Sequence, residues 1–183
     1  ERALEHVKRI REIDREMDGR IRVFTGIEVD ILSDGELDLP NEVLAQMDVV
    51  IASVHSLFQQ PGEQMTNRIL KALDNPYVRI LGHPTGRLLL RREAYEMDVA
   101  AVPAHAVKRG VALEHNAYPD RLDLCDVHLR RVKELGGRIV VSTDAHHTSH
   151  LDKMRYGVRQ LRRAWLTKDD VLNTQPADAF VAA

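Results

Sequence analysis

Histidines and carboxylates recur along this sequence at a nearly constant interval. The recurring set is Glu28, His55, His83, Glu114 with His115, and Asp144 with His146. The steps from Glu28 through His55, His83 and Glu114 to Asp144 measure 27, 28, 31 and 30 residues. Imidazole and carboxylate groups together bind zinc, manganese or iron, and one carboxylate can bridge two cations. Two neighbouring divalent cations can activate water and stabilise both oxygens of an in-line phosphoryl displacement. The pattern therefore predicts a metal site suited to phosphoester hydrolysis.

Each of these positions also has an ordinary structural explanation. His55 alone could be a core histidine, Glu28 could form a salt bridge, and Asp144 could cap a turn. Five positions that share one repeat length favour a common site over independent coincidences. The histidines expected on solvated helix faces are His6, His105 and His128. The sequence has no Gly-rich phosphate loop or Ser-His-Asp pattern that would favour other chemistry.

The elements that must position these groups alternate between strands and helices. Apolar, β-branched runs predict strands at 21–29, 49–54, 77–81, 111–113 and 138–142. Helical periodicity predicts helices at 1–17, 41–46, 63–74, 93–109 with a possible break at Pro103, 124–135, 150–163 and 168–172. Ser149 with Asp152 and Thr167 with Asp170 resemble helix N-caps. A βαβ unit needs about 30 residues. The alternation therefore predicts an α/β fold, a parallel sheet or barrel with the recurring side chains at its carboxyl edge.

Composition limits the class of protein. The 183 residues fit one domain, and 44% of them are hydrophobic, yet no apolar run approaches the length of a membrane span. The single cysteine, Cys125, excludes a disulfide framework and favours a reducing cytosol, so we expect a cytoplasmic protein without membrane contact. The net charge of −2 does not favour nucleic-acid binding, which would need local arginine clusters or metals. Because the chain opens on Glu1 inside an expected helix, we expect a fragment.

Several segments resemble a known family. GIEVDIL (26–32), VIASVHS (50–56), ILGHPTGR (80–87) and STDAHHTSH (142–150) resemble the PHP (polymerase and histidinol phosphatase) superfamily. HPTGRLLLRRE, NAYPDRLDL (116–124) and MRYGVRQLRRAWL more narrowly resemble the C-terminal PHP domain of bacterial family X DNA polymerases. The resemblance covers nearly the whole chain.

The resemblance implies a distorted seven-stranded βα barrel with up to three divalent ions, manganese or zinc. Glu28 then corresponds to the bridging carboxylate, His55 and His83 to ligands of one ion, Asp144 to a ligand of a second and His146 to a ligand of a third. Glu28, Asp144 and His146 are the implied catalytic residues. The implied activity is a 3′→5′ exonuclease or phosphodiesterase on DNA in repair, beside a polymerase domain of the same full-length chain.

The sequence departs from the family pattern in two places. The family's first motif, His-x-His, is absent, so we expect an N-terminally incomplete domain over 1–172, a loose tail over 173–183, and possible self-association through the truncated sheet edge. His115 stands where a hydrophobic residue is usual. Its side chain should point away from that of Glu114, which predicts a structural role.

Arginines near the strand ends are candidate phosphate contacts, because a planar guanidinium matches phosphate oxygens. Arg87, Arg121 and Asn116 are the expected substrate-binding residues, whereas Arg159, Arg162 and Arg163 are expected on a solvated helix face. Two alternatives to the nuclease stay open at this point. One is a histidinol-phosphatase-type phosphomonoesterase, and the other is a non-catalytic scaffold for an attached polymerase.

Overall fold

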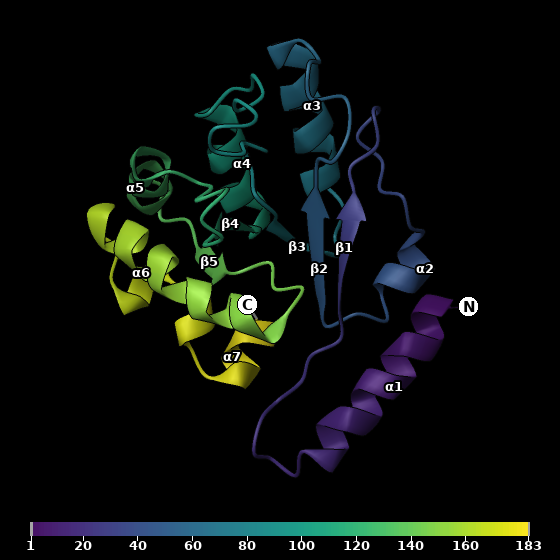
Figure 1. The fold of residues 1–183 in the computed structure, drawn as a ribbon. Coiled ribbons are helices and arrows are strands. Elements are labelled where there is room, and N and C mark those ends of the chain that lie inside the picture. The colour runs from purple at the N-terminus through teal and green to yellow at the C-terminus, as the bar shows by residue number, and fades with distance from the viewer. Residues whose placement is uncertain (1, 183) are drawn as a thin grey trace.

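Within residues 2–182, which the computed structural model describes, five strands form one parallel sheet (Figure 1). The strands are β1 (Gly26–Asp30), β2 (Val49–Ser53), β3 (Val78–Leu81), β4 (Ala112–Asn116) and β5 (Ile139–Ser142). The helices are α1 (Arg2–Glu16), α2 (Asn41–Leu44), α3 (Gly62–Leu73), α4 (Ala101–Arg109), α5 (Asp126–Glu134), α6 (Met154–Arg163) and α7 (Ala177–Ala182). Short 3₁₀ turns lie at Thr148–Lys153, Lys168–Asp170 and Leu172–Thr174.

The sheet places every carboxyl strand end at the same edge. Each strand pairs in parallel with the next one along the chain, in the order β1-β2-β3-β4-β5. This arrangement confirms the α/β prediction and is consistent with a βα barrel-like fold. The seven strands expected of the barrel are not found in residues 2–182, where the sheet has five. The self-association expected at a sheet edge stays a prediction.

The sheet is packed on both faces, as its nearly continuous apolar strands require. The main core includes Leu113 and Val141 of the sheet and receives Ile69 of α3, Leu129 of α5 and Leu161 of α6. A second cluster contains Ile80, Ala112 and Val140, packed by Leu172 and Phe180 of the C-terminal segment. Ala112 alternates with Leu113, and Val140 with Val141, so the two clusters lie on opposite faces.

The segment expected to be a loose tail makes several contacts. The Asn173 side chain accepts a hydrogen bond from Val141 N at 3.1 Å and donates to Val141 O at 2.7 Å. The Phe180 ring lies 5.9 Å from that of Phe24 between centroids. How loosely the tail is held, and the division of the chain at residue 172, stay predictions.

Helix α1 lies beside α2 at the β1 edge of the sheet (Figure 1). Arg11 Nη2 donates to Gln46 O at 3.1 Å, and Asp14 Oδ1 accepts the Val23 N–H at 2.7 Å. Glu1, the first residue of the helix expected at 1–17, and Ala183, the last residue of the expected tail, lie outside the described residues. Within residues 2–182, no helix has the length and apolar character needed to cross a membrane.

Three predicted boundaries differ in the structure. The helix expected from 93 begins at Ala101, because Asp98 Oδ1 accepts the N–H groups of Ala100 and Ala101 at 2.8 and 2.9 Å and fixes the start there. Pro103 falls in the first turn of α4, where a missing N–H is tolerated, so the helix is not broken. The strand expected from residue 21 begins at Gly26, and the strand expected at 111–113 continues to Asn116.

The two expected N-caps had different outcomes. Thr167 and Asp170 form the capping box that their spacing predicts. The Ser149 cap was wrong, because the ring of His147 accepts the Ser149 N–H and caps a 3₁₀ turn instead. The regular helix α6 therefore begins only at Met154.

Candidate metal centre

Three of the predicted metal ligands meet at the carboxyl edge of the sheet. Glu28 comes from β1, His55 follows β2, and His83 follows β3. Glu28 Oε1 lies 3.4 Å from His55 Nε2 and 3.1 Å from His83 Nε2. One ligand atom from each residue lies within 4.8 Å of the other two. The geometry therefore brings one carboxylate and two imidazoles to a single point.

This donor set fits a divalent cation. His83 is only 2% exposed, and neither of its ring nitrogens has a well-formed hydrogen bond among the described residues, although Nε2 faces Glu28. A buried imidazole without partners is costly unless something else binds it. One carboxylate with two imidazoles suits zinc or manganese. A cation bound by Glu28, His55 and His83 removes this cost.

The backbone around His83 is built for a close approach. A Cβ atom on Gly82 would lie 2.3 Å from Ser53 Oγ and 3.5 Å from Glu28 Oε1, so glycine is required there. His83 itself has a φ of +25°, a conformation that L-residues rarely adopt. Glu114 Oε2 accepts the His83 N–H at 2.5 Å and holds this turn. Strained backbone of this kind clusters at functional sites.

The ligands also perturb one another electrostatically. Burial by itself would raise the pKa of Glu28, but the polar groups of His55, His83 and Ser53 beside the carboxylate outweigh it and hold the pKa well below its usual range. The Glu28 carboxylate, helped by Asp30, raises the pKa of His55 to about 9. Without a metal the site therefore holds a carboxylate beside a protonated imidazole, a charge pattern that a bound cation would replace.

Asp144 and His146 lie in a second group rather than in the three-residue cluster. Asp144 has a φ of +50° and a mostly buried side chain. Its carboxylate lies 3.4 Å from Asn116 Nδ2, 3.7 Å from Arg121 Nε and 3.6 Å from His146 Nδ1. The structure thus groups two predicted ligands with two predicted substrate contacts. Their roles as ligands or contacts stay predictions.

The predicted substrate arginines differ in what they contact. Arg87 donates through Nε to Arg121 O at 2.9 Å and through Nη2 to Leu122 O, so it supports the loop that carries Arg121. Arg121 is partly buried, and its Nη1 has no hydrogen-bond partner among the described residues. A buried donor without a partner is available for an anion. Arg121 is therefore the better placed of the two for a phosphate.

Sequence reasoning missed two acidic contributors. Asp30 Oδ1 lies 2.5 Å from His55 Nδ1 and orients that ring. Asp30 stands two residues after Glu28 in β1, so strand alternation could have placed both on one face. Glu114 was noticed in the repeat but given no role, and it holds the His83 turn and accepts from Ser142 Oγ. Burial raises the pKa of Glu114.

His115 lies in the core, as strand alternation predicts. It is fully buried, and its Nδ1 lies 2.8 Å from Leu124 O. Burial lowers the pKa of His115 to about 4, so the ring is neutral. His105, expected on a solvated face, is half-buried and lies 2.8 Å from Asp74 Oδ1.

A buried arginine fixes the two loops that flank His55. Arg68 of α3 is 2% exposed. It donates to Ile31 O and to Leu32 O at 2.8 Å in the loop after β1, and to Ser56 O and Gln60 Oε1, both at 3.0 Å, in the loop after β2. One side chain of α3 therefore connects the loop after β1 to the loop after β2.

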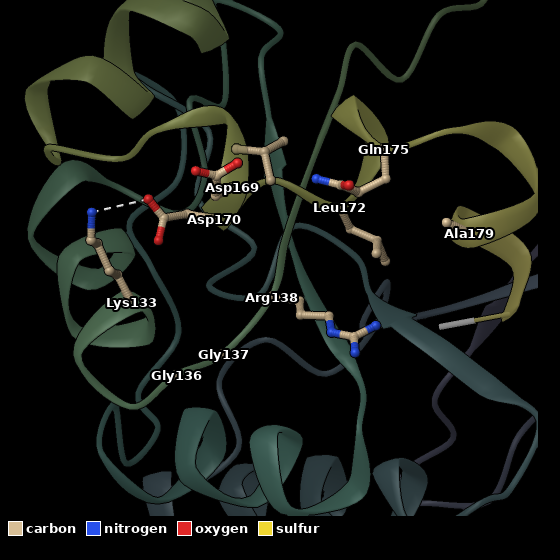
Figure 2. A pocket seen from close by; sticks show the side chains of 10 residues that line it. Lys133, Gly136, Gly137, Arg138, Asp169, Asp170, Leu172, Gln175 and Ala179 are labelled. Atoms are coloured by element: carbon tan, nitrogen blue, oxygen red, sulfur yellow. Dashed lines mark hydrogen bonds and ion pairs between the residues drawn. The ribbon is translucent and has the colours of Figure 1, made fainter.

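A cavity of about 770 Å³ lies at the other end of the sheet (Figure 2). Gly136, Gly137 and Arg138, which precede β5, line it together with the C-terminal segment. Figure 2 shows Lys133 beside this cavity, where its Nζ lies 3.0 Å from Asp170 Oδ2. None of the predicted ligands lines this cavity, so it is separate from the candidate metal centre.

The fold and the cluster define an α/β domain with a Glu–His–His centre at the carboxyl edge of a parallel sheet. The chain is 44% identical over 175 residues to a DNA polymerase/3′-5′ exonuclease PolX of Bacillus subtilis (strain 168), a match covering 96% of this chain and 30% of that protein. It is 32% identical over 164 residues to a probable phosphatase of Thermoanaerobacter sp. (strain X514), covering 84% of this chain and 64% of that protein. No family model matches the chain.

These similarities confirm the resemblance that the sequence motifs carry, and they are consistent with a PHP-type domain. A probable phosphatase of Clostridium acetobutylicum is also 30% identical over 163 residues. The chain spans 30% of the PolX and 64% of each of these phosphatases, less than two thirds of each relative.

Proposed function

We propose that this chain is a metal-dependent phosphoesterase domain that acts on DNA as a 3′→5′ exonuclease or phosphodiesterase. The convergence of Glu28, His55 and His83 at the carboxyl edge is the observation that carries the proposal. The similarity to a PolX and to probable phosphatases supports a phosphoester substrate. We further propose a role in DNA repair, beside a polymerase domain in a longer chain, in which the five strands form part of a seven-stranded barrel.

The chain's own residues have separable roles in this proposal. Glu28, His55 and His83 hold one divalent ion, manganese or zinc, and Asp144 and His146 extend the ligand set. When bound, such ions supply Lewis-acid polarisation of the phosphoryl group and neutralise developing charge. Arg121 lies beside Asp144 and presents its buried Nη1 donor toward a phosphate oxygen. Asn116 fixes the Asp144 side chain through its amide.

The proposal is tested by manganese-dependent hydrolysis of a 3′-labelled oligonucleotide. Asp144→Ala should abolish hydrolysis while the circular dichroism spectrum is kept, because Asp144 lies outside the main hydrophobic core. Asp169→Ala is the matched control, since this exposed carboxylate lines the cavity at the other end of the sheet. Full activity in Asp144→Ala, or no hydrolysis of any phosphoester by the metal-loaded chain, would contradict the proposal.

A phosphomonoesterase is the second candidate, favoured by the probable phosphatases among the relatives. The same cation site serves both reactions, and the surroundings of the site decide which ester enters. Hydrolysis of histidinol phosphate or p-nitrophenyl phosphate, without attack on a DNA 3′ end, would favour this reading over the nuclease.

A further inference from the structure

One segment of the chain concentrates positive charge. Residues 153–168 contain six cations and no Asp or Glu, although the whole chain carries a net charge of −2. The cations are Lys153, Arg155, Arg159, Arg162, Arg163 and Lys168. A segment with six cations and no acidic residue, in an otherwise acidic chain, produces a local positive field.

This segment is seated directly against the strands that carry the second site group. A Cβ atom on Gly157 of α6 would lie 2.6 Å from Ala117 Cβ and 2.7 Å from Val141 Cγ2, so the helix backbone approaches the sheet closely there. Ala117 directly follows Asn116, the residue that contacts Asp144. Figure 1 shows α6 running along the outer side of the molecule past β5 and α5. The helix is therefore fixed next to the candidate site.

The outward face of α6 carries arginines in a row. Arg155, Arg159 and Arg162 are exposed and follow the i, i+4, i+7 spacing of one helical face. No ion pair involves these three side chains in the part of the chain that the structure describes, whereas Arg163 pairs with Asp126 at 3.1 Å. Arg155 donates to the Tyr156 hydroxyl at 3.2 Å, and its guanidinium lies 5.0 Å from the centre of that ring. Their charges are free for an external partner.

An exposed aromatic ring stands at the end of this row. Trp165 is 73% exposed and has a φ of +61°. The Arg130 guanidinium lies 4.5 Å from the centre of its ring, and Lys133 Nζ donates to Trp165 O at 2.8 Å. The tryptophan is thus held at the surface rather than in the core. Exposed aromatic rings beside cations are platforms on which nucleobases stack.

We propose that the outward face of α6, made of Arg155, Arg159 and Arg162 with Trp165 at its end, binds the backbone of a nucleic acid strand next to the bond that is cleaved. This inference rests on the proposed function, and it names the surface that holds the polymer. Seven residues of helix span about 10 Å at 1.5 Å per residue. The three arginines along that length can each contact one phosphate of the strand.

The pattern fits nucleic acid better than a membrane surface. An interfacial helix presents a broad apolar face outward. In α6, Leu161 and Gly157 are buried against the protein, and the exposed residues are four arginines and one apolar residue: Arg155, Val158, Arg159, Arg162 and Arg163. Regularly spaced single charges match regularly spaced phosphates.

The test compares two triple variants that lower the net charge equally. Arg155→Gln/Arg159→Gln/Arg162→Gln removes the proposed contacts, and Lys8→Gln/Arg9→Gln/Arg15→Gln removes exposed cations of α1. Fluorescence anisotropy measures binding of a labelled 12-nucleotide single strand across a salt series in EDTA, so that no metal is needed. With about 0.7 of slope per phosphate contact, the α6 triple should reduce the slope of log K against log salt by about two, and the α1 triple should leave it unchanged.

Trp165→Ala measures the stacking contribution separately. Loss of one stacked base should weaken binding about fivefold or more with the salt slope kept, because no charge is removed. Equal slopes for the two triple variants, or α6-dependent binding to phosphatidylserine vesicles without DNA binding, would overturn the inference.

A second measurement keeps this inference apart from the proposed function. Bis-(p-nitrophenyl) phosphate is a diester without flanking phosphates, so its hydrolysis by the wild-type protein reports on the metal centre alone. Diester hydrolysis combined with unchanged DNA binding by the α6 triple would overturn the binding face and leave the enzyme. If the wild-type protein hydrolyses no diester but the α6 triple variant shows the expected loss of salt slope, the proposed enzyme activity fails and the binding face stands.

Discussion

Replacing Arg68 with methionine should loosen the loops that flank His55. The change keeps a long apolar stem and removes the guanidinium, whose acceptors include the main-chain oxygens of Ile31, Leu32 and Ser56. Ile31 is fully buried, so its stranded carbonyl costs about 1–3 kcal/mol. The other two residues are exposed and can be hydrated, which limits each loss to about 0.5–1.5 kcal/mol. We expect a destabilisation of about 3 kcal/mol, or a melting temperature lower by roughly 6–12 °C.

Thermal unfolding followed by circular dichroism, without metal, measures this effect. Lys71→Met on the same helix is the matched control, because it removes one cation from an exposed pair with Glu36 (2.8 Å) and should change stability little. Manganese binding by calorimetry then shows whether His55 has moved, since looser loops should weaken the affinity. A melting temperature for Arg68→Met equal to that of Lys71→Met, with full metal affinity, would refute the argument that Arg68 holds these loops.

Four further predictions concern the metal centre and α6. Glu28→Gln should weaken manganese or zinc binding more than tenfold in calorimetry and keep the fold, because it removes the charge shared by the two histidines; unchanged affinity would exclude Glu28 as a ligand. Metal affinity should rise with pH up to about 9 and then level off, because bound metal displaces the proton that Glu28 keeps on His55. The metal-free chain should become less stable over the same rise, from about 6.5 to 9, because the folded state holds that proton more tightly than the unfolded one; a melting temperature that is flat with pH would contradict this. Gly157→Ala should destabilise the fold by about 1–3 kcal/mol in urea, since its methyl group would overlap Ala117 and Val141; a stabilised variant would show that α6 can shift.

The strands and helices predicted from periodicity largely agreed with the structure, whereas several of the predicted first and last residues of these elements did not. The alternation of strands and helices predicted a parallel sheet or barrel, because each strand-plus-helix unit has a nearly constant length, and the structure has a parallel sheet of five strands. The helix predicted to begin at residue 93 begins at Ala101 instead. Asp98 accepts the N–H groups of Ala100 and Ala101 and so sets the first turn there. Thr167 with Asp170 was correctly identified because a capping box is a purely local motif.

The residues at the carboxyl ends of the strands could be predicted from the sequence alone. That follows from alternation and spacing, which depend on local geometry alone. The folded structure was needed to see that Glu28, His55 and His83 converge, while Asp144 and His146 lie with Arg121 instead. Which of these side chains lie together depends on the register of the strands and on the turns that orient each side chain.

Two further site features also needed the folded structure. The positive φ of His83 and the absence of a side chain at Gly82 bring the ring to Glu28, and no periodicity encodes either. Arg87 was predicted to contact phosphate, yet it donates to main-chain oxygens of a strand-end loop, as the buried Arg68 also does. Whether an arginine binds a ligand or its own backbone is decided by which acceptors are in reach after folding, because the guanidinium must be satisfied wherever it is buried.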